Sequence, residues 1–499
     1  MPVSLTGRRR VNYGMTTETH PPRSIRTAVE SRTMKRDRAQ AIETHTIAPI
    51  PLDQRHGRAR DLFTIWFGSN LSLLTVSTGM LGTAVYGLSV WPAIAALMLG
   101  NVLGAIVMAL HAAQGPQMGV PQMLQTRAQF GSYGSLLVVI LVIVMYIGFF
   151  ASSMTLGGQA LAHLLGFNET SAVVTVGLVS AVAAIVGYRM IHQFGRVLTV
   201  CSGLIVVFAF YEVLTNTSVQ SAIGAAGSFT WLGFMGTVSV AALWQIAYAP
   251  YVSDYSRYMP QDSGVRSAFW ATLSGTVLGS ALHMILGALL GAAFPELGPI
   301  DSIARATGSA STIIVAIFAV GIAGANAMNL YCGALSTITV GQTLFPSWQP
   351  RSAARAVVTM CLFPLALAIA IVGKDNFLVN FTNFLLLLLC VLIPWTAINL
   401  VDYYLLKHGH YDLGSLFERD GGEYGKYNWV AIGCYFVGIA VQVPFLSTQL
   451  YTGPAASALD GVDVSWLVGL SVVCPLYFVL MKRFDRATAL RVQLAAQRR

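Results

Sequence analysis

Charged residues are scarce in this sequence. Asp, Glu, Lys and Arg make up only 10% of its 499 residues, whereas hydrophobic residues make up 55%. A soluble globular protein carries about 25% charged residues, so composition excludes a soluble fold of this length. The 47 glycines suit the close packing of helices in lipid. The composition therefore predicts an all-α integral membrane protein.

Cysteine is also rare, and its spacing excludes several kinds of site. The six cysteines are scattered and none forms a C-x-x-C pair, which argues against a disulfide framework or a metal site. The sequence contains no P-loop, zinc signature or nucleophile–base motif, so we expect no enzyme activity and no cofactor. Basic residues are not interleaved with aromatic ones, which argues against nucleic acid as a partner.

Long apolar stretches are abundant instead. A membrane-spanning helix needs about 20 mostly apolar residues. Twelve such spans are expected, at 62–84, 90–111, 134–162, 170–187, 197–214, 231–251, 267–293, 309–331, 354–373, 377–401, 429–447 and 464–481. We expect 1–60, which is polar and lacks the apolar core of a signal peptide, to be a disordered cytoplasmic tail. The transmembrane domain then covers 61–482, and 483–499 form a cytoplasmic C-terminal tail.

The basic residues predict the orientation of the spans. Cytoplasmic loops of membrane proteins are enriched in Lys and Arg. With twelve spans and the N-terminus inside, 28 of the 30 basic residues face the cytoplasm, and only Arg305 and Lys374 face outward. We therefore expect a multi-pass protein of the cell membrane with both termini in the cytoplasm. Nothing in the pattern indicates an oligomeric state.

The first span carries polar residues at the depth where hydrocarbon is expected. Gly68 is followed by Ser69, Asn70, Leu71 and Ser72. Polar groups there are costly and therefore point to function. The pattern suits a broken helix in which backbone groups around Gly68 and Leu71 coordinate a cation, while Asn70 and Ser72 bind a solute. Hydrogen bonding between helices by small polar residues is the alternative.

The sixth span combines an aromatic face with an amide. Trp244, Tyr248 and Tyr251 share one helical face beside Gln245, and Pro250 interrupts the helix. This face suits stacking on a planar heterocycle, although an aromatic belt at the cytoplasmic interface gives a similar pattern. Interrupted helices at matching positions of the first and sixth spans are typical of a transporter substrate site.

The eighth span contains Asn326 and Asn329, three residues apart on one helix face. Each amide offers a donor and an acceptor, and the edge of a nucleobase alternates between the two. We therefore expect at least one of them to bind the solute, with pairing between helices as the alternative.

Ionisable residues near the spans are few. Glu212 and Asp254 are candidates for proton coupling. The alternatives are that Glu212 reaches interfacial water and that Asp254 pairs with Arg257. His283, inside the seventh span, is interpreted as a hydrogen-bonded core histidine.

Five segments carry a recognisable pattern. They are IWFGSNLSLLT (65–75), GPQMGVPQMLQTRAQFG (115–131), GGQAL (157–161), APYVSDYSRYMP (249–260) and NAMNLYCGALS (326–336). Together they resemble the nucleobase–cation symporter family, in particular its purine–cytosine permease branch, whose relatives carry hydantoins and allantoin. The resemblance covers roughly residues 45–480, and the 115–131 loop and the D-Y-S-R-Y run are its most specific parts.

The resemblance implies a LeuT-like core in which spans 1–5 and 6–10 form inverted repeats, with two further helices appended. It implies a solute held between aromatic side chains of spans three and six, and read by polar side chains of spans one, three and eight. By position these residues are Phe149, Ser153, Trp244, Gln245, Asn329, Asn326, Ser72 and Asn70.

Two positions depart from the family pattern. Phe149 stands where the family has a stacking tryptophan, and Ser153 stands where it has an amide, which puts the usual pose of a cytosine-like solute in doubt. Sodium-coupled relatives place two hydroxyls where this chain has Ala323-Gly324-Ala325. We therefore expect a proton, in preference to sodium, as the co-transported ion.

The function predicted is secondary active import of a nucleobase, such as cytosine or a purine, by cation symport. Another small heterocycle, such as allantoin, a hydantoin or a vitamin, is the alternative, because a fold does not fix a substrate. A membrane sensor or enzyme is a third possibility that no motif favours.

Overall fold

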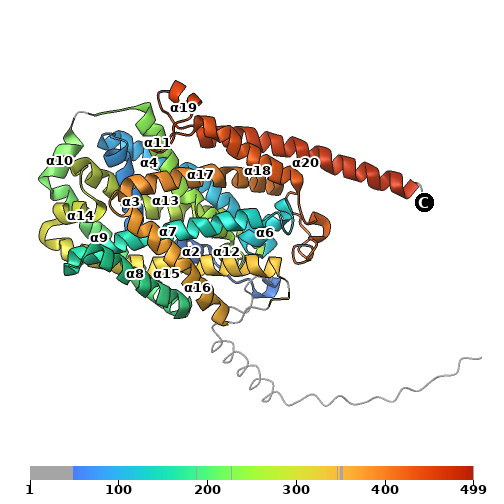
Figure 1. Cartoon of the computed structure of the whole chain (residues 1–499), viewed down its shortest axis with the longest axis horizontal. Coiled ribbons are helices and arrows are strands. Elements are labelled where there is room, and N and C mark those ends of the chain that lie inside the picture. The colour runs from blue at the N-terminus through green and yellow to red at the C-terminus, as the bar shows by residue number, and fades with distance from the viewer. Residues whose placement is uncertain (1–48, 187, 226, 346, 349–351, 498–499) are drawn as a thin grey trace, which may run out of the picture. The chain divides into compact units, whose positions relative to one another are not determined.

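A computed structural model describes residues 49–497 except 187, 226, 346 and 349–351 (Figure 1). The described part contains no β-strand, and its one isolated bridge joins Ser447 and Thr452. The predicted all-α class is confirmed. The longer helices are α4 (Val90–Ala112), α7 (Leu136–Leu165), α8 (Glu169–Val186), α9 (Tyr188–Thr215), α11 (Trp231–Ile246), α13 (Gln261–Ala293), α15 (Ser311–Leu344), α16 (Ser352–Gly373), α17 (Phe377–Val401), α18 (Trp429–Gln442) and α20 (Ser465–Gln497).

Shorter helices connect and interrupt the long ones. They are α2 (Ala59–Ser69), α3 (Leu73–Met80), α5 (Gln114–Met118), α6 (Gln122–Phe130), α10 (Thr217–Gly224), α12 (Val252–Ser256), α14 (Pro299–Thr307) and α19 (Pro454–Ala458). Two π-helical turns, Leu81–Val85 and Asp402–Leu406, extend α3 and α17. Such turns are rare and are frequently found at functional sites.

The apolar helices follow the predicted spans. Eight helices of the described part are long and apolar enough to cross a membrane, and the bent pair Val200–Thr215 and Thr217–Gly224 makes a ninth if it forms one span. Three shorter apolar helices are Leu73–Val85, Glu169–Ile185 and Trp429–Phe445. Each of the twelve predicted spans overlaps one of these segments. Since only eight or nine qualify on their own, the number twelve stays a prediction.

The first span is broken where the polar residues stand. α2 ends at Ser69, and α3 begins at Leu73 after Ser72, whose side chain accepts from the backbone N–H of Thr75 (3.3 Å). Ser and Asn side chains compete with helical hydrogen bonds and favour helix ends. The predicted interruption of the first span is therefore confirmed.

The sixth span is broken as well. α11 ends at Ile246, a short 3₁₀ turn covers Ala249–Tyr251, and α12 follows from Val252. Pro250 cannot donate a helical hydrogen bond, which explains why the regular helix does not continue through it. The predicted break near Pro250 is confirmed.

Glycines allow the helices around these breaks to touch. A Cβ on Gly100 or Gly104 of α4 would lie 2.2 Å from the carbonyl oxygen of Val238 or Ala242 on α11. A Cβ on Gly79 of α3 would lie 2.1 Å from a carbonyl oxygen of α13. Small residues at such crossings let backbones approach closely in a membrane bundle.

The helix pairs repeat across the two halves of the predicted core. α4 packs along α11, which pairs spans two and six, and α13 packs along α2 and α3, which pairs spans seven and one. These two pairings exchange when spans 1–5 are superposed on spans 6–10, as inverted repeats require. α7 and α15, the third and eighth spans, form the most extensive helix contact in the described part.

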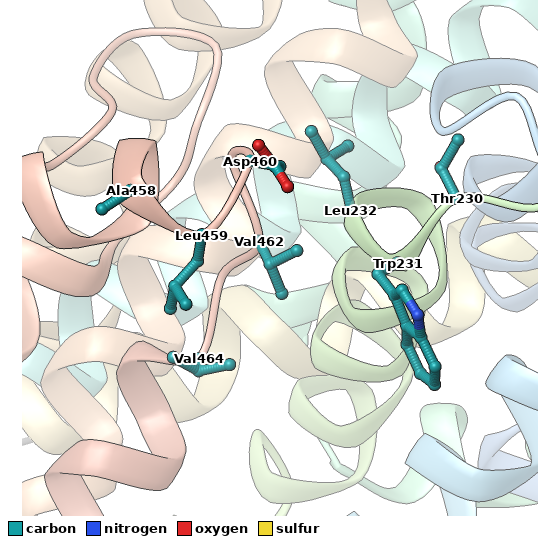
Figure 2. Close-up of a pocket in the computed structure, with 8 residues that line it drawn as sticks. All are labelled: Thr230, Trp231, Leu232, Ala458, Leu459, Asp460, Val462 and Val464. Atoms are coloured by element: carbon teal, nitrogen blue, oxygen red, sulfur yellow. The ribbon is translucent and has the colours of Figure 1, made fainter.

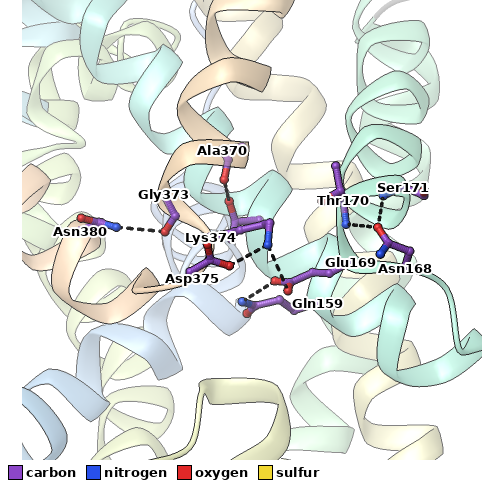
Figure 3. A network of polar contacts seen from close by, with 11 residues as sticks. Gln159, Asn168, Glu169, Thr170, Ser171, Ala370, Gly373, Lys374, Asp375 and Asn380 are labelled. Carbon is purple, nitrogen blue, oxygen red and sulfur yellow. Dashed lines mark hydrogen bonds and ion pairs between the residues drawn. The ribbon is translucent and has the colours of Figure 1, made fainter.

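A polar cluster joins the ends of α7, α8 and α16 (Figure 3). Gln159 donates to Glu169 Oε1 (3.0 Å), and Lys374 Nζ lies 3.9 Å from Glu169 Oε2 and 2.7 Å from Asp375 Oδ1. The hydrogen bond to Asp375 raises the pKa of Lys374. Lys374, predicted on the outer side, thus connects the α16–α17 turn to α8.

The residues just before α2 contact the helical body. Ile50 is buried and its N–H donates to the carbonyl of Gly119 (3.0 Å), while Arg55 Nη1 donates to the carbonyl of Pro116 (2.6 Å). Residues 1–48 of the predicted N-terminal tail lie outside the described residues.

Candidate functional site

The break in the first span places Asn70 in the interior. Its amide nitrogen donates to the carbonyl of Trp66 (2.8 Å) and to Thr276 Oγ1 on α13 (3.0 Å). Its Oδ1 accepts from the indole N–H of Trp244 (2.8 Å). Both ends of the Asn70 amide are therefore engaged by protein groups, which supports the interhelical alternative for this residue.

An aromatic cluster surrounds Trp244. The Phe149 ring of α7 meets the Trp244 ring edge to face, with centroids 6.1 Å apart, and Phe384 of α17 meets Phe149 at 5.2 Å. Trp244, Tyr248 and Tyr251 form a chain of ring contacts at 6.1 and 5.8 Å, so the predicted shared face is confirmed. The structure thus brings the two predicted stacking residues, Phe149 and Trp244, together.

Gln245 is enclosed in a buried polar cluster. Its Nε2 donates to Asn101 Oδ1 of α4 (2.5 Å) and to Ser280 Oγ of α13 (2.9 Å), and its Oε1 accepts from the Thr276 hydroxyl. All four side chains are buried. Gln245 therefore joins α4, α11 and α13, and its amide is already engaged as both donor and acceptor.

The contact between α7 and α15 fixes the level at which the candidates on these helices face each other. A Cβ on Gly157 would lie 3.1 Å from Ile322, and a Cβ on Gly333 would lie 3.5 Å from Tyr146. The two helices are therefore antiparallel in register. Ser153 lies four residues before Gly157 and Asn326 lies four residues after Ile322, so these two residues stand at the same level.

Asn326 differs from the other predicted amides. It is 0% exposed, and neither its Oδ1 nor its Nδ2 has a hydrogen-bond partner among the described residues. An unpaired buried amide costs about 1–3 kcal/mol, so such a group in a native protein needs an explanation. Asn329, one turn further along α15, is half-buried, and Ser153 is buried on the facing helix.

The remaining first-span candidates lie at the break itself. Ser72 caps α3, and its hydroxyl lies 2.9 Å from that of Thr75. The carbonyl of Gly68 accepts from the N–H of Leu71 (3.1 Å). Leu71 also lies 3.8 Å from a Cβ placed on Gly203 of α9, so the break faces that helix.

The two acids proposed for coupling lie in different surroundings. Glu212 is half-buried near the end of α9. Asp254 Oδ1 accepts from the backbone N–H of Gln122 (2.9 Å), at the N-terminus of α6, where a negative charge is favoured. Arg257 Nε donates to the backbone carbonyl of Asp254 (3.3 Å).

Other predictions on ionisable groups and cations stand as follows. His283 is buried with Nδ1 3.3 Å from the carbonyl of Gly279, which supports its interpretation as a core histidine. The side chains of Ala323-Gly324-Ala325 lie outside the described residues. Within the described residues no group of three or more His, Cys, Asp or Glu could hold a metal ion.

A surface depression of about 700 Å³ lies elsewhere. Figure 2 shows Thr230, Trp231 and Leu232, at the start of α11, facing the segment from Ala458 to Val464. Trp244 lies more than three turns further along α11. The polar side-chain groups in its lining are the Thr230 hydroxyl, the Trp231 indole N–H and the Asp460 carboxylate, and it contains none of the predicted site residues.

Sequence reasoning missed Asn101, Thr276 and Ser280, which hold Gln245. A lone asparagine within the apolar second span was a usable signal, because a polar group at that depth is costly. Thr276 and Ser280 could not be distinguished from the other hydroxyl residues of the sequence, since Ser and Thr are common at the helix interfaces of membrane proteins.

Comparisons with known proteins extend over nearly the whole chain. Residues 49–469 match the family model described as permease for cytosine/purines, uracil, thiamine, allantoin. YxlA of Bacillus subtilis, named as a candidate purine-cytosine permease, is 37% identical over 443 residues, which cover 88% of this chain and 96% of that protein. The purine-cytosine permease fcyB of Emericella nidulans is 24% identical over 466 residues, covering 88% of each protein.

Solved structures show the same architecture. The inward-facing conformation of Mhp1 superposes with a TM-score of 0.71 at 19% identity, covering 90% of this chain and 95% of that one. Its closed conformation with bromovinylhydantoin bound gives 0.70 at 18% identity, covering 89% and 96%. The expected transporter fold is thereby confirmed.

Proposed function

Since this chain belongs to the family of permeases for cytosine and purines, uracil, thiamine and allantoin, we propose that it imports a cytosine-like or purine-like nucleobase together with a proton. The chain is a multi-pass membrane transporter and not an enzyme. The solute, its pose and the coupling ion are the proposed parts.

The unpartnered amide of Asn326 is the observation that carries the proposal. Asn326 is buried on α15 at the level of Ser153 of α7. α7 also carries Phe149, whose ring contacts Trp244. A planar base placed between these elements can stack on an aromatic ring, and stacking is worth about 1–3 kcal/mol per base. Its edge can give the Asn326 amide the donor and acceptor that the protein does not supply.

The proposal assigns different roles to the sequence-predicted residues. Asn326, Asn329 and Ser153 read the edge of the solute, while Phe149 and Trp244 turn out of their edge-to-face contact to stack on its faces. Ser72, Asn70 and Gln245 act mainly by shaping the site, because their polar groups bond to the protein.

A second solute class follows from one observation. Phe149 lacks an indole donor and Ser153 lacks an amide. The span-three side of the site therefore offers a cytosine-like solute fewer hydrogen bonds than the tryptophan and amide of the family pattern would. A heterocycle read mainly from the opposite edge fits such a site. The family description includes allantoin, and one fold neighbour was solved with a hydantoin bound, so these are the alternatives to be tested.

The uptake experiment uses proteoliposomes and labelled cytosine, adenine, hypoxanthine, uracil, allantoin and hydantoin. We expect saturable accumulation of a nucleobase, blocked by excess unlabelled solute and absent in a Trp244→Ala control. Accumulation of allantoin or hydantoin alone would establish the second class. Failure with every heterocycle, in a preparation that melts cooperatively, would refute both.

Proton coupling is proposed because Ala323-Gly324-Ala325 supplies no hydroxyl for sodium. A proton needs only one titratable group that changes its exposure between states, and Asp254 and Glu212 are the proposed groups. Imposed gradients separate the two ions. Accumulation driven by sodium at equal pH, with none driven by an acidic exterior in sodium-free buffer, contradicts proton symport.

The two acids are compared by charge-neutral substitution. In Asp254→Asn and Glu212→Gln, a coupling residue loses concentrative uptake while exchange of solute across the membrane continues. A residue with a structural role loses both activities.

A reporter active only in the cytoplasm, fused at Arg499 and at Ser457, tests the proposed cytoplasmic termini, and activity at Ser457 alone contradicts that orientation.

A further inference from the structure

The 115–131 loop is one of the two most specific motifs of the sequence, and no role in solute binding accounts for it. It folds into α5 and α6 with the connection between them. Three of the glutamines on these helices, Gln114, Gln122 and Gln129, are at most 1% exposed. A glutamine with no bonding role is expected at the surface, so these side chains have partners that the sequence does not reveal.

One end of this set holds the inner half of the broken sixth span. Ser253 of α12 donates to Gln122 Oε1 (2.6 Å), and the backbone N–H of Gln122 donates to Asp254 (2.9 Å). A Cβ on Gly115 would lie 2.1 Å from Ser256 Oγ, so α5 and α12 touch directly. Gln122 Nε2 in turn donates to Gln114 Oε1 (3.4 Å).

The other end leads to a buried carboxylate. Gln114 Nε2 donates to Asn399 Oδ1 of α17 (2.8 Å), and Asn399 Nδ2 donates to Gln129 Oε1 (3.4 Å). Gln129 Nε2 donates to the hydroxyl oxygen of Tyr411 (3.5 Å), whose O–H donates to Asp402 Oδ2 (2.6 Å). A continuous amide relay, Gln122–Gln114–Asn399–Gln129, therefore connects α12 to Asp402.

Asp402 is held by two tyrosines at the π-helical end of α17. Its Oδ1 accepts from Tyr477 of α20 (2.9 Å), and the side chain is 1% exposed. Among the described side chains, the other charged and titratable groups near it include Lys407, which pairs with Asp485 at 3.7 Å, and Tyr403, whose ring stacks on Tyr411.

The relay combines firm anchors with weak links. Its bonds at 3.4–3.5 Å are longer than the usual range for N–H···O bonds, about 2.7–3.2 Å. The bonds at its two ends, from Ser253 and Tyr411, are 2.6 Å long. The central bond, from Gln114 to Asn399, is 2.8 Å long, and the longest contact, from Gln129 to Tyr411, lies beside the Asp402 end. In transporters with broken helices, access alternates largely by the rocking of one repeat or bundle against the other, so the contacts of α12 with α6 and, through the relay, with α17 are candidates for change between access states.

We propose that Asp402 is a positioning residue for transport: ionised, it anchors the amide relay that holds α12 in place, and on protonation it releases α12. This rests on the proposed function only in taking α12 as a moving element of a symporter. It adds an acid, distant from the solute site, to Asp254 and Glu212 as a place where protons act.

The protonation step follows from donor and acceptor counts. An ionised carboxylate only accepts hydrogen bonds, and Asp402 accepts one from each tyrosine. A proton on one oxygen makes that oxygen a donor, so the tyrosine facing it must turn its own O–H elsewhere. If the proton sits on Oδ2, the Tyr411 oxygen accepts from it, and the Tyr411 O–H turns to its other side, where it opposes the long N–H contact from Gln129 (3.5 Å).

Hydrogen–deuterium exchange on the purified full-length protein tests the proposal. The readout is protection of α12, corrected for intrinsic exchange, over a series of pH values. We expect protection in the native chain to fall about tenfold from the ionised to the protonated form of Asp402, equivalent to 1.4 kcal/mol. Asp402→Asn should show low protection that no longer depends on pH.

Three variants separate the parts of the relay. Tyr411→Phe should weaken α12 protection, whereas Tyr424→Phe is the matched control, since the Tyr424 hydroxyl accepts from a loop backbone N–H (2.7 Å) outside the relay. Asn399→Leu cuts the relay between its ends and should make α12 insensitive to pH. Asp254→Asn should keep the pH response if Asp402 is the titrating group.

Two results would overturn the proposal: a pH response of α12 in Asp402→Asn equal to the native one, or native protection of α12 in Asn399→Leu. If Asp402→Asn lowers the protection of every helix, Asn399→Leu shows whether the relay holds α12 specifically or Asp402 stabilises the whole protein. Solute is absent from this experiment, so a protein that carries no nucleobase but shows the α12 response refutes the proposed function and leaves this proposal standing.

Discussion

Replacement of Asn326 by alanine separates a solute-binding amide from a structural one. The amide has no partner among the described residues, so Asn326→Ala removes a group that is costly in the empty protein. Relief of a buried unpaired amide is worth about 1–3 kcal/mol, which offsets the lost packing. We therefore expect the melting temperature of the solute-free variant to be equal to or above that of the native protein.

The effect on binding should have the opposite sign. Two neutral hydrogen bonds to the solute, at about 1 kcal/mol each, correspond to a loss of about 2 kcal/mol, or roughly 30-fold in Kd. At a solute concentration of about 100 times the native Kd, binding stabilises the native protein by about 2.7 kcal/mol. In the variant the same concentration is only about three times Kd, and the stabilisation falls to about 0.8 kcal/mol.

A thermal-shift assay with and without the solute identified by uptake measures both effects. Asn101→Ala is the matched control, because the Asn101 amide is bonded to Gln245 and Ser280 and its loss should lower the melting temperature without solute. The reasoning is refuted if Asn326→Ala melts earlier than the native protein, as the control does, and retains the full solute-induced shift.

Three further predictions concern the elements that hold the site. Asn70→Ala should destabilise the solute-free protein by about 1–3 kcal/mol, because the buried Trp244 N–H loses its acceptor; an unchanged melting temperature contradicts this. Trp244→Ala should abolish binding, whereas Trp244→Phe should keep part of it and melt earlier, since Asn70 then lacks its donor; equal binding loss in both would assign the effect to the indole N–H. Gly104→Val should prevent folding, because a Cβ there would lie 2.2 Å from the carbonyl oxygen of Ala242. Gly224→Ala is its control, since a Cβ on Gly224 would meet no atom of another segment within 4 Å. Normal expression of both variants in the membrane would contradict the close packing at Gly104.

Local sequence patterns predicted the helices and their breaks. The apolar stretches matched the helices because length and hydropathy are properties of each segment alone. The breaks after Ser69 and near Pro250 could be predicted because Ser, Asn and Pro act on the backbone within a few residues. The contact between Phe149 and Trp244 was available only through the family resemblance, since nothing local in either span indicates the other.

Which polar residue serves the fold and which serves the solute was not predictable in this way. Asn70, Gln245 and Asn326 are all buried amides in apolar spans, and all three were predicted to bind the solute. The structure engages the first two and leaves the third without a partner in the part that it describes. The same holds for Gln114 and Gln122, between the second and third predicted spans, which the structure buries against α17 and α12.

The sequence by itself determined that this protein is a helical membrane transporter of a recognisable family, with interruptions in its first and sixth spans. Only the tertiary structure decided the partners of its buried polar groups. The reason is physical: the acceptor of the Trp244 N–H lies 174 residues away, and the side-chain partner of the Asn70 amide lies 206 residues away. A hydrogen bond depends on distance in space to a few tenths of an ångström, and the packing of all the spans together sets that distance.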